Sequence, residues 1–154
     1  MSLNKLFFTG LLFCLLSGCG DKRDNKQILV LNVLDQELYS DCHIRGSVNV
    51  PLDNDNLEEY VKDLDLNREI VVYCSNYFCT ASQYAVELLQ KLGFKHVYAY
   101  EAGMAEWRQR GLPIDGPAVQ DYLTRVVAPP KEHATNIKII TTDELAVKMG
   151  LKIS

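Results

Sequence analysis

Two cysteines separated by four residues are the part of this sequence best suited to chemistry. Cys74 directly follows the apolar run Glu69–Tyr73, which predicts a central strand, and Cys79 directly precedes the predicted helix Thr80–Leu92. A cysteine at the carboxyl end of a parallel strand faces the crevice where open α/β sheets bind ligands. Loop amides and the positive end of the helix dipole favour a thiolate there, and the thiolate is the nucleophile. The spacing therefore predicts a reactive Cys74; the alternative is a buried, inert cysteine that only fills space.

The elements around this loop alternate between strand and helix. Near-continuous apolar runs predict buried strands, and apolar residues at 3.6 spacing predict helices. The predicted strands are Ile28–Val33, Ser47–Val50, Glu69–Tyr73, His96–Tyr100 and Ile137–Ile140, and the predicted helices are Asn56–Leu64, Thr80–Leu92, Met104–Arg110 and Ala118–Val127. Thr80 and Gln83 are spaced as a capping box at the start of the second helix. This alternation predicts an α/β fold, with helices on both faces of a parallel sheet.

The residues beyond Gly116 form an extension of different character. Ala128–His133 has the composition of a linker. Thr141 and Glu144 have the spacing of a second capping box, which predicts a last helix through Met149.

The amino-terminal residues resemble a bacterial export signal. Met1–Lys5 carries one positive charge, and the apolar run Leu6–Leu16 is too short to span a bilayer but suits a secretory signal. Small residues then precede Cys19, as in the lipobox of lipoproteins, where cleavage leaves a lipidated cysteine. We therefore expect a signal peptide at 1–18, a polar tether at 19–26, and an exported protein anchored by lipid to a bacterial membrane, facing the periplasm or the cell exterior. The alternative, a buried helix, would show polar residues at helical spacing, and this run shows none.

Composition excludes several classes of protein. The chain has 154 residues, 47% hydrophobic and 23% charged, which is typical of one globular domain and excludes wholesale disorder. Sixteen basic and twenty acidic side chains give a net charge of -4, which argues against a nucleic-acid partner. His96 and His133 have no partners at metal-ligand spacing, so we predict neither a metal site nor a cofactor.

Four motifs, in order and in register, resemble those of the rhodanese-like domain family. They are Cys42–Pro51, the strand end Val71–Cys74, Gly93–Tyr98, and Glu101–Trp107 followed by Gly111-Leu112-Pro113. The resemblance covers Gln27–Ile114 and implies a three-layer sandwich around a central, mostly parallel five-stranded sheet. We accordingly expect a rhodanese-like domain at 27–116 and a C-terminal extension at 117–154.

The resemblance also implies an activity, that of a sulfurtransferase of the cell envelope. Cys74 takes the place of the family's catalytic cysteine, which accepts a sulfane sulfur as a persulfide and passes it to a thiol. The implied partners are a small sulfur donor and a thiol acceptor. The loop residues implied to bind the anionic sulfur are Ser75, Asn76, Tyr77, Phe78 and Thr80. Glu101 and Gly103 are implied to border the active crevice.

Two departures from the family pattern remove positive charge. The family's loop carries an arginine five residues after the cysteine, where this chain has Cys79, and the Asp-Val-Arg that ends the first strand is Asn32-Val33-Leu34 here. Both cations would help to seat thiosulfate, so polysulfide, persulfide or small-thiol substrates are expected instead. The same lack argues against phosphatase chemistry, which needs cationic stabilisation of the transferring group.

Cys79 leaves two other functions open. A C-x4-C loop recurs in a subset of rhodanese-like proteins, where the second cysteine can close a disulfide with the first. The chain could thus be a thiol–disulfide redox protein or sensor that uses Cys74 and Cys79, or a non-catalytic binding module on the same fold. Cys79 could also merely fill space in the loop. Cys42 replaces a glycine in a turn and is interpreted as structural.

The C-terminal extension contains one further resemblance. Ile139–Ala146 is similar to the short strand and helix that usually open a rhodanese domain, and only a polar tether precedes Gln27 here. We expect this segment to pack at the sheet edge, either in its own chain or in a neighbouring chain by swapping.

Overall fold

The structure is a computed structural model that describes residues 27–53, 55–130 and 136–153. Its elements, in chain order, are β1 Leu29–Asn32, α1 Gln36–Asp41, β2 His43–Ile44, β3 Val48–Asn49, α2 Asn56–Val61, β4 Glu69–Tyr73, α3 Ala81–Lys91, β5 His96–Tyr100, α4 Gly103–Gln109, β6 Ile114–Asp115, the 3-10 helix η1 Asp121–Thr124 and α5 Thr142–Lys148. The predicted signal peptide, the tether with Cys19, and His133 lie outside the described residues.

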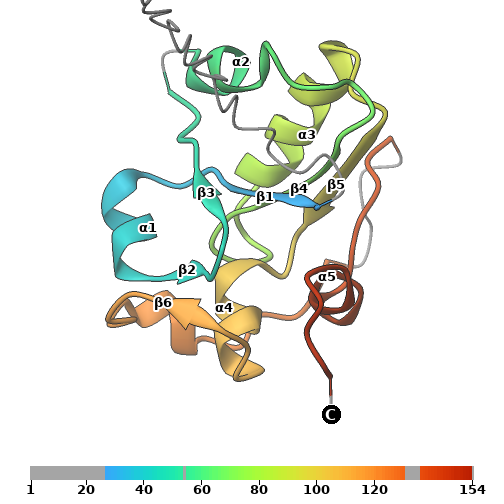
Figure 1. Ribbon diagram of the computed structural model, residues 1–154. Coiled ribbons are helices and arrows are strands. Elements are labelled where there is room, and N and C mark those ends of the chain that lie inside the picture. Colours follow the sequence, from blue (N-terminus) through green and yellow to red (C-terminus); the bar gives the residue numbers. More distant parts are fainter. Residues whose placement is uncertain (1–26, 54, 131–135, 154) are drawn as a thin grey trace, which may run out of the picture.

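The central sheet is parallel and runs in the order β3-β1-β4-β5, with helices packed around it (Figure 1). Leu31 of β1 lies opposite Val72 of β4, and Val72 lies opposite Ala99 of β5. These three side chains are fully buried in one core cluster with residues of α2 and α3. The prediction of an α/β fold with a mostly parallel sheet is therefore confirmed.

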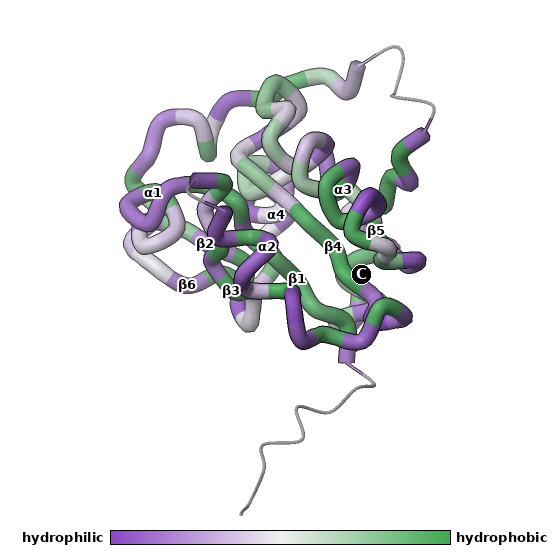
Figure 2. Tube along the Cα trace, turned by 90° about the horizontal axis from the view of Figure 1, so that it is seen from above, coloured by the Kyte–Doolittle hydropathy of each residue, from purple (hydrophilic) through white to green (hydrophobic). Residues whose placement is uncertain are grey.

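The opposite face of the same sheet supports a second core. Val71 and Tyr73 alternate with Val72 along β4 and pack with Trp107 of α4 and Leu145 of α5. Both faces of β4 are thus covered, which explains why its sequence is a continuous apolar run. In Figure 2 the hydrophobic strands β1 and β4 pass through the middle of the molecule.

The fifth predicted strand, Ile137–Ile140, is reduced to a single bridge. Ile139 pairs in parallel with Ala99 of β5, and Ala99 donates to the carbonyl of Lys138 at 2.9 Å. The extended segment stops there because Thr141 and Glu144 form the predicted capping box, which opens α5. The described central sheet consequently has four strands rather than five. The C-terminal segment lies at the sheet edge in its own chain, as expected, beside β5 (Figure 1).

Some local predictions were wrong. The predicted helix Ala118–Val127 is only the short 3-10 helix η1. The side chain of Gln109 donates to the carbonyls of Leu123 and Arg125, and these bonds hold the segment in a non-helical path. Helix α1 and the small antiparallel pair β2–β6 were not predicted. Within the described residues, no helix is long and apolar enough to cross a membrane.

Candidate active site

Cys74 lies directly after the carboxyl end of β4, where the strand passes into the loop that leads to α3. Its side chain is fully buried. The Cys74 Sγ donates to the carbonyl oxygen of Cys79 at 3.1 Å and lies 3.6 Å from the Oγ of Ser82. The fold therefore places Cys74 at the bottom of the loop, with Cys79 above it and α3 beside it.

Cys79 lies at the other end of the loop and is only partly buried. The Cys74 thiol, the backbone N–H groups of Ala81 and Ser75 and the Ser75 hydroxyl lower the pKa of Cys79 to about 6, against the effect of its partial burial. The hydrogen bond to Cys79 and burial instead raise the pKa of the Cys74 thiol. The first proton that the pair loses therefore comes from Cys79, which becomes a thiolate while Cys74 stays a thiol.

The loop between the cysteines is closed by its own hydrogen bonds. The N–H of Phe78 donates to Oδ1 of Asn76 at 3.0 Å, and the N–H of Cys79 donates to the Asn76 carbonyl at 3.0 Å. These two amides, expected to hold an anionic sulfur, are therefore engaged within the loop. Asn76 is buried, Ser75 and Tyr77 are half-buried, and the Phe78 side chain is 82% exposed at the loop surface.

The start of α3 differs from the predicted capping box. Thr80 occupies the N-cap position and is exposed, but its side chain makes no capping hydrogen bond. Gln83 does not return to the helix start, because its Nε2 donates to Oε1 of the buried Glu101 at 2.6 Å. Glu101 thus orients the first turn of α3, which carries Ser82 against Cys74.

Gly103 lies against the backbone of the loop, and its place requires glycine. Its φ is +62°, and a Cβ atom there would come within 2.7 Å of the Cys74 carbonyl oxygen. The next two amides fasten the loop to α4: Met104 N–H donates to the Cys74 carbonyl at 3.0 Å, and Ala105 N–H to the Ser75 carbonyl at 2.9 Å. The close approach at Gly103 therefore makes these two bonds possible.

A polar network joins the loop to the C-terminal extension. Tyr77 Oη donates to Oε2 of Glu106 at 3.1 Å, while Thr142 Oγ1 donates to the other Glu106 oxygen. Thr142 is also bonded to the Tyr100 hydroxyl at 2.9 Å. Sequence reasoning missed Glu106 and Ser82, because their partners are set by the packing of α4, α5 and the loop. The sequence signals near this network were the capping box that starts α5 and the motif Glu101–Trp107, but neither gave the partners of Glu106.

The charges around the loop are mostly negative. Glu101 and Glu106 lie on its α4 side. Arg110 lines the same cavity but is paired with Asp143, and no arginine or lysine belongs to the loop itself. Arg125 of the extension lines a small cavity of about 80 Å³ with Asn76 and Tyr77. At the end of β1, Asn32 occupies the first position of the Asp-Val-Arg motif, and its Oδ1 accepts the N–H of Leu34 at 2.9 Å. A doubly negative donor therefore meets little positive charge here.

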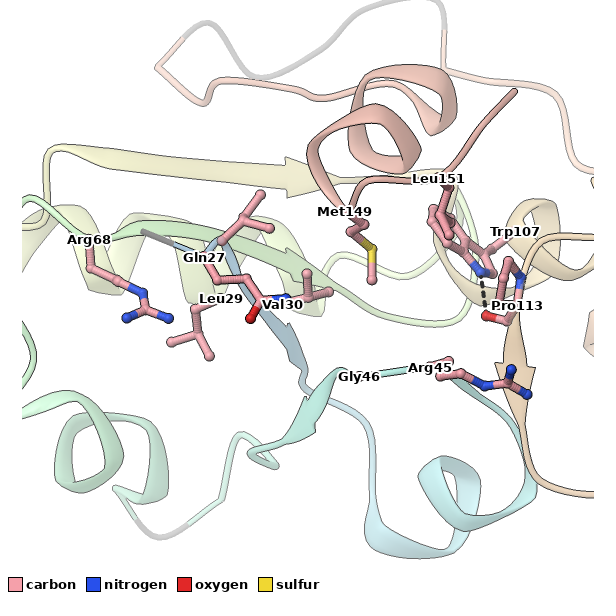
Figure 3. Close-up of a pocket in the computed structure, with 11 residues that line it drawn as sticks. Gln27, Leu29, Val30, Arg45, Gly46, Arg68, Trp107, Pro113, Met149 and Leu151 are labelled. Carbon is pink, nitrogen blue, oxygen red and sulfur yellow. Dashed lines mark hydrogen bonds between the residues drawn. The ribbon is translucent and has the colours of Figure 1, made fainter. Parts of the chain in front are cut away.

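A larger cavity lies away from this chemistry. It has a volume of about 510 Å³ and is lined by the amino-terminal part of β1, by Arg45, Arg68 and Trp107 and by the last residues after α5 (Figure 3). Because β1 and β4 are parallel, this cavity lies toward the opposite end of the sheet from Cys74. Its lining contains no cysteine, and its polar groups include a Trp107 indole that donates to the Pro113 carbonyl at 2.9 Å. The cysteine loop is therefore the better candidate for the active site.

The third described cysteine is inert. Cys42 is fully buried in the core cluster that contains Tyr73 and Trp107, and burial raises its pKa to about 11. Such a thiol has little thiolate at neutral pH. Within the described parts of the chain, no three His, Cys, Asp or Glu side chains gather as a metal site requires.

Comparison with known proteins agrees with this arrangement. The chain is 31% identical over 84 residues to the thiosulfate sulfurtransferase GlpE of Shewanella oneidensis, a match that covers 54% of this chain and 79% of that protein. It is 32% identical over 94 residues to the HTH-type transcriptional regulator Rv0324 of Mycobacterium tuberculosis, covering 61% of this chain but only 40% of the regulator. The crystal structure of the Alr3790 protein from Anabaena is similar with a TM-score of 0.53 at 32% identity, over 60% of this chain and 80% of that one.

The family comparison covers the same region. The Rhodanese-like domain family matches residues 19–110, which is more than half of the chain and includes the strand, the cysteine loop and the start of α4. The protein therefore belongs to the rhodanese-like domain family.

Proposed function

We propose that this protein is a sulfurtransferase that carries sulfane sulfur as a persulfide on Cys74 and gives it to a thiol acceptor. The observation that carries the proposal is the place of Cys74, at the carboxyl end of β4 and below a loop that leads into α3, in a domain of the rhodanese-like family. Two relatives whose sequences align with this chain over 79% and 70% of their own length are named thiosulfate sulfurtransferases.

The reaction needs only the two substrates and the loop. In the first half, a cysteine thiolate attacks the outer sulfur of a donor R–S–S⁻, the S–S bond of the donor breaks, and R–S⁻ leaves. In the second half, an acceptor thiolate attacks the outer sulfur of the Cys74 persulfide and frees the Cys74 thiolate. No electron is gained or lost overall, so the cycle requires no cofactor.

The charge of the site favours particular donors. The GlpE relatives are named for thiosulfate, but this loop carries Cys79 where the family has an arginine. With Glu101 and Glu106 beside the loop, a dianion is held less well than a monoanionic or neutral donor. We therefore expect a low-molecular-weight persulfide, or polysulfide in its singly protonated form, to be used in preference to thiosulfate.

A thiol–disulfide redox function is the second candidate, and one contact favours it. The Cys74 sulfur lies 3.1 Å from the carbonyl oxygen of Cys79 and within hydrogen-bonding reach of its sulfur. If Cys79 attacked the inner sulfur of a Cys74 persulfide, a disulfide would form and hydrosulfide would leave. A reductant of the thiol class would then have to reopen the disulfide.

Mass spectrometry of the intact protein separates these functions. After treatment with polysulfide and removal of excess reagent, a sulfurtransferase gains the mass of one sulfur atom, and digestion locates it on the cysteine loop. Loss of two hydrogens without added sulfur would instead indicate the redox function. An unchanged mass would leave a non-catalytic binding module.

We also propose that the protein works outside the cytosol, anchored through a lipid on Cys19. The apolar run Leu6–Leu16 and the small residues before Cys19 support this. Two or more acyl chains hold a protein stably on a membrane, whereas one chain does not. Cells fed labelled palmitate should label the wild type but not Cys19→Ala, and equal labelling of the two would refute the anchor.

A further inference from the structure

The two cysteines of the active loop differ in how solvent reaches them. Cys74 is fully buried, whereas Cys79 is only partly buried and follows the exposed Phe78. A sulfur donor that diffuses to the closed loop therefore meets the sulfur of Cys79 before that of Cys74.

The hydrogen bonds of the loop also place the proton. A carbonyl oxygen only accepts hydrogen bonds, so the 3.1 Å contact from Cys74 Sγ to the Cys79 carbonyl favours the protonated thiol of Cys74 over its thiolate. A Cys74 thiolate in this position would face the lone pairs of that oxygen in a buried site, which is unfavourable. Ser82 donates toward Cys74 and opposes this effect, but burial and Cys79 outweigh it.

Cys79 has the opposite environment. The N–H groups of Ser75 and Ala81 and the Ser75 hydroxyl serve its sulfur as donors, and Ala81 is the first residue of the eleven-residue helix α3. Donors of this kind, at the positive end of a helix dipole, stabilise a thiolate. In the resting loop the nucleophilic form of cysteine is therefore on Cys79.

We propose that Cys79 is the first acceptor of sulfane sulfur and that it passes the sulfur inward to Cys74. This relay rests on the proposed sulfurtransferase function and adds to it the order in which the two cysteines act. It gives Cys79 a catalytic part that replaces the missing loop arginine, because the sulfur donor is captured by a partly exposed thiolate rather than held by a cation.

The steps of the relay balance. The Cys79 thiolate attacks the outer sulfur of R–S–S⁻, forming a Cys79 persulfide and releasing R–S⁻. The Cys74 sulfur then attacks the outer sulfur of that persulfide, the Cys79 S–S bond breaks, and the Cys74 proton passes to the departing Cys79 sulfur. The product is an anionic Cys74 persulfide beside a Cys79 thiol, with no oxidant or reductant consumed.

The test is rapid-quench loading of the full-length protein with polysulfide at pH 6, with trapping by iodoacetamide. Chymotrypsin cuts after Tyr77 and Phe78, so the sulfur on each cysteine is measured on a separate peptide. In the wild type, the Cys79 persulfide should form first and decay as the Cys74 persulfide grows. In Cys74→Ser, Cys79 should still take up sulfur, and the sulfur should stay there.

Cys79→Ser should load Cys74 about tenfold more slowly or worse at pH 6, because only a protonated, buried thiol remains. Cys42→Ala serves as the matched control and should load like the wild type. Loading of Cys74 at an unchanged rate in Cys79→Ser, or formation of the Cys74 persulfide first in the wild type, would overturn the relay while leaving the sulfurtransferase function intact. A wild type that takes up no sulfur would overturn both.

Discussion

The backbone of Gly103 lies against the backbone of Cys74 so closely that a Cβ atom at position 103 would come within 2.7 Å of the Cys74 carbonyl oxygen. This approach lets the amides of Met104 and Ala105 bind the carbonyls of Cys74 and Ser75. These backbone hydrogen bonds hold the loop against the start of α4, whatever the ionisation state of its cysteines.

Gly103→Ala should therefore damage the loop. Gly111 provides the control, since its φ of +67° is similar to the +62° of Gly103 but a Cβ atom there would meet nothing within 4 Å. We expect Gly111→Ala to lower the free energy of unfolding by about 1 kcal/mol through backbone strain alone. Gly103→Ala should cost about 3 kcal/mol or more because the clash is added. Equal costs in urea unfolding would contradict the contact.

The ionisation of Cys79 predicts an unusual pH dependence of alkylation. A lowered pKa means that the thiolate exists above about pH 6 and is protonated below it. The rate of iodoacetamide reaction at Cys79 should therefore rise through about pH 6 and level off by about pH 7.5, whereas an ordinary thiol, of pKa about 8.5, is still rising there. Cys74→Ser should move the midpoint upward, because it replaces the thiol that donates to Cys79. A midpoint near 8.5 in the wild type would refute the assignment.

The C-terminal extension should be part of the folded domain. Leu145 of α5 is fully buried in the core cluster with Tyr73 and Trp107, whereas Val147 on the same helix is 63% exposed. Leu145→Ala should lower the free energy of unfolding by about 2–5 kcal/mol. Val147→Ala should change it by less than about 0.5 kcal/mol. If thermal or urea unfolding shows no difference between the two, α5 does not pack as described.

The bond from Tyr77 to Glu106 should hold the loop to α4. Tyr77→Phe removes the hydroxyl that donates to Glu106 and should cost about 0.5–1.5 kcal/mol of unfolding free energy. Tyr84 of α3 is 61% exposed, so Tyr84→Phe is a suitable control and should be nearly neutral. A Tyr77→Phe protein as stable as the Tyr84→Phe control would mean that the bond contributes nothing.

The sequence predicted the parts of the fold whose pattern is long and regular. The apolar run Glu69–Tyr73 became β4, and the helical spacing of Thr80–Leu92 became α3, shortened at each end. Since the cysteine loop joins these two elements, its position could be predicted as well. The capping box at Thr141 was also correct, because it depends on residues close in sequence.

The remaining features depend on tertiary contacts. Strands β2 and β6 have two residues each, too few to show a period, and they pair across a separation of about seventy residues. Gln83 has the spacing of a capping residue, but Glu101 from another element takes its side chain. Glu106 meets Tyr77 and Thr142 only after α4 and α5 pack on the same face of the sheet. No local pattern encodes such contacts.

The most direct test of the account is the transfer of sulfur from polysulfide to a small thiol by the wild type, Cys74→Ser and Cys42→Ala. Cys74 and Cys42 are both fully buried, but only Cys74 lies in the active loop. We predict that Cys74→Ser lowers the catalysed rate at least about a hundredfold, as expected when a covalent nucleophile is removed, while Cys42→Ala retains most of it. A Cys74→Ser protein that transfers sulfur within about twofold of the wild-type rate would contradict the proposed function.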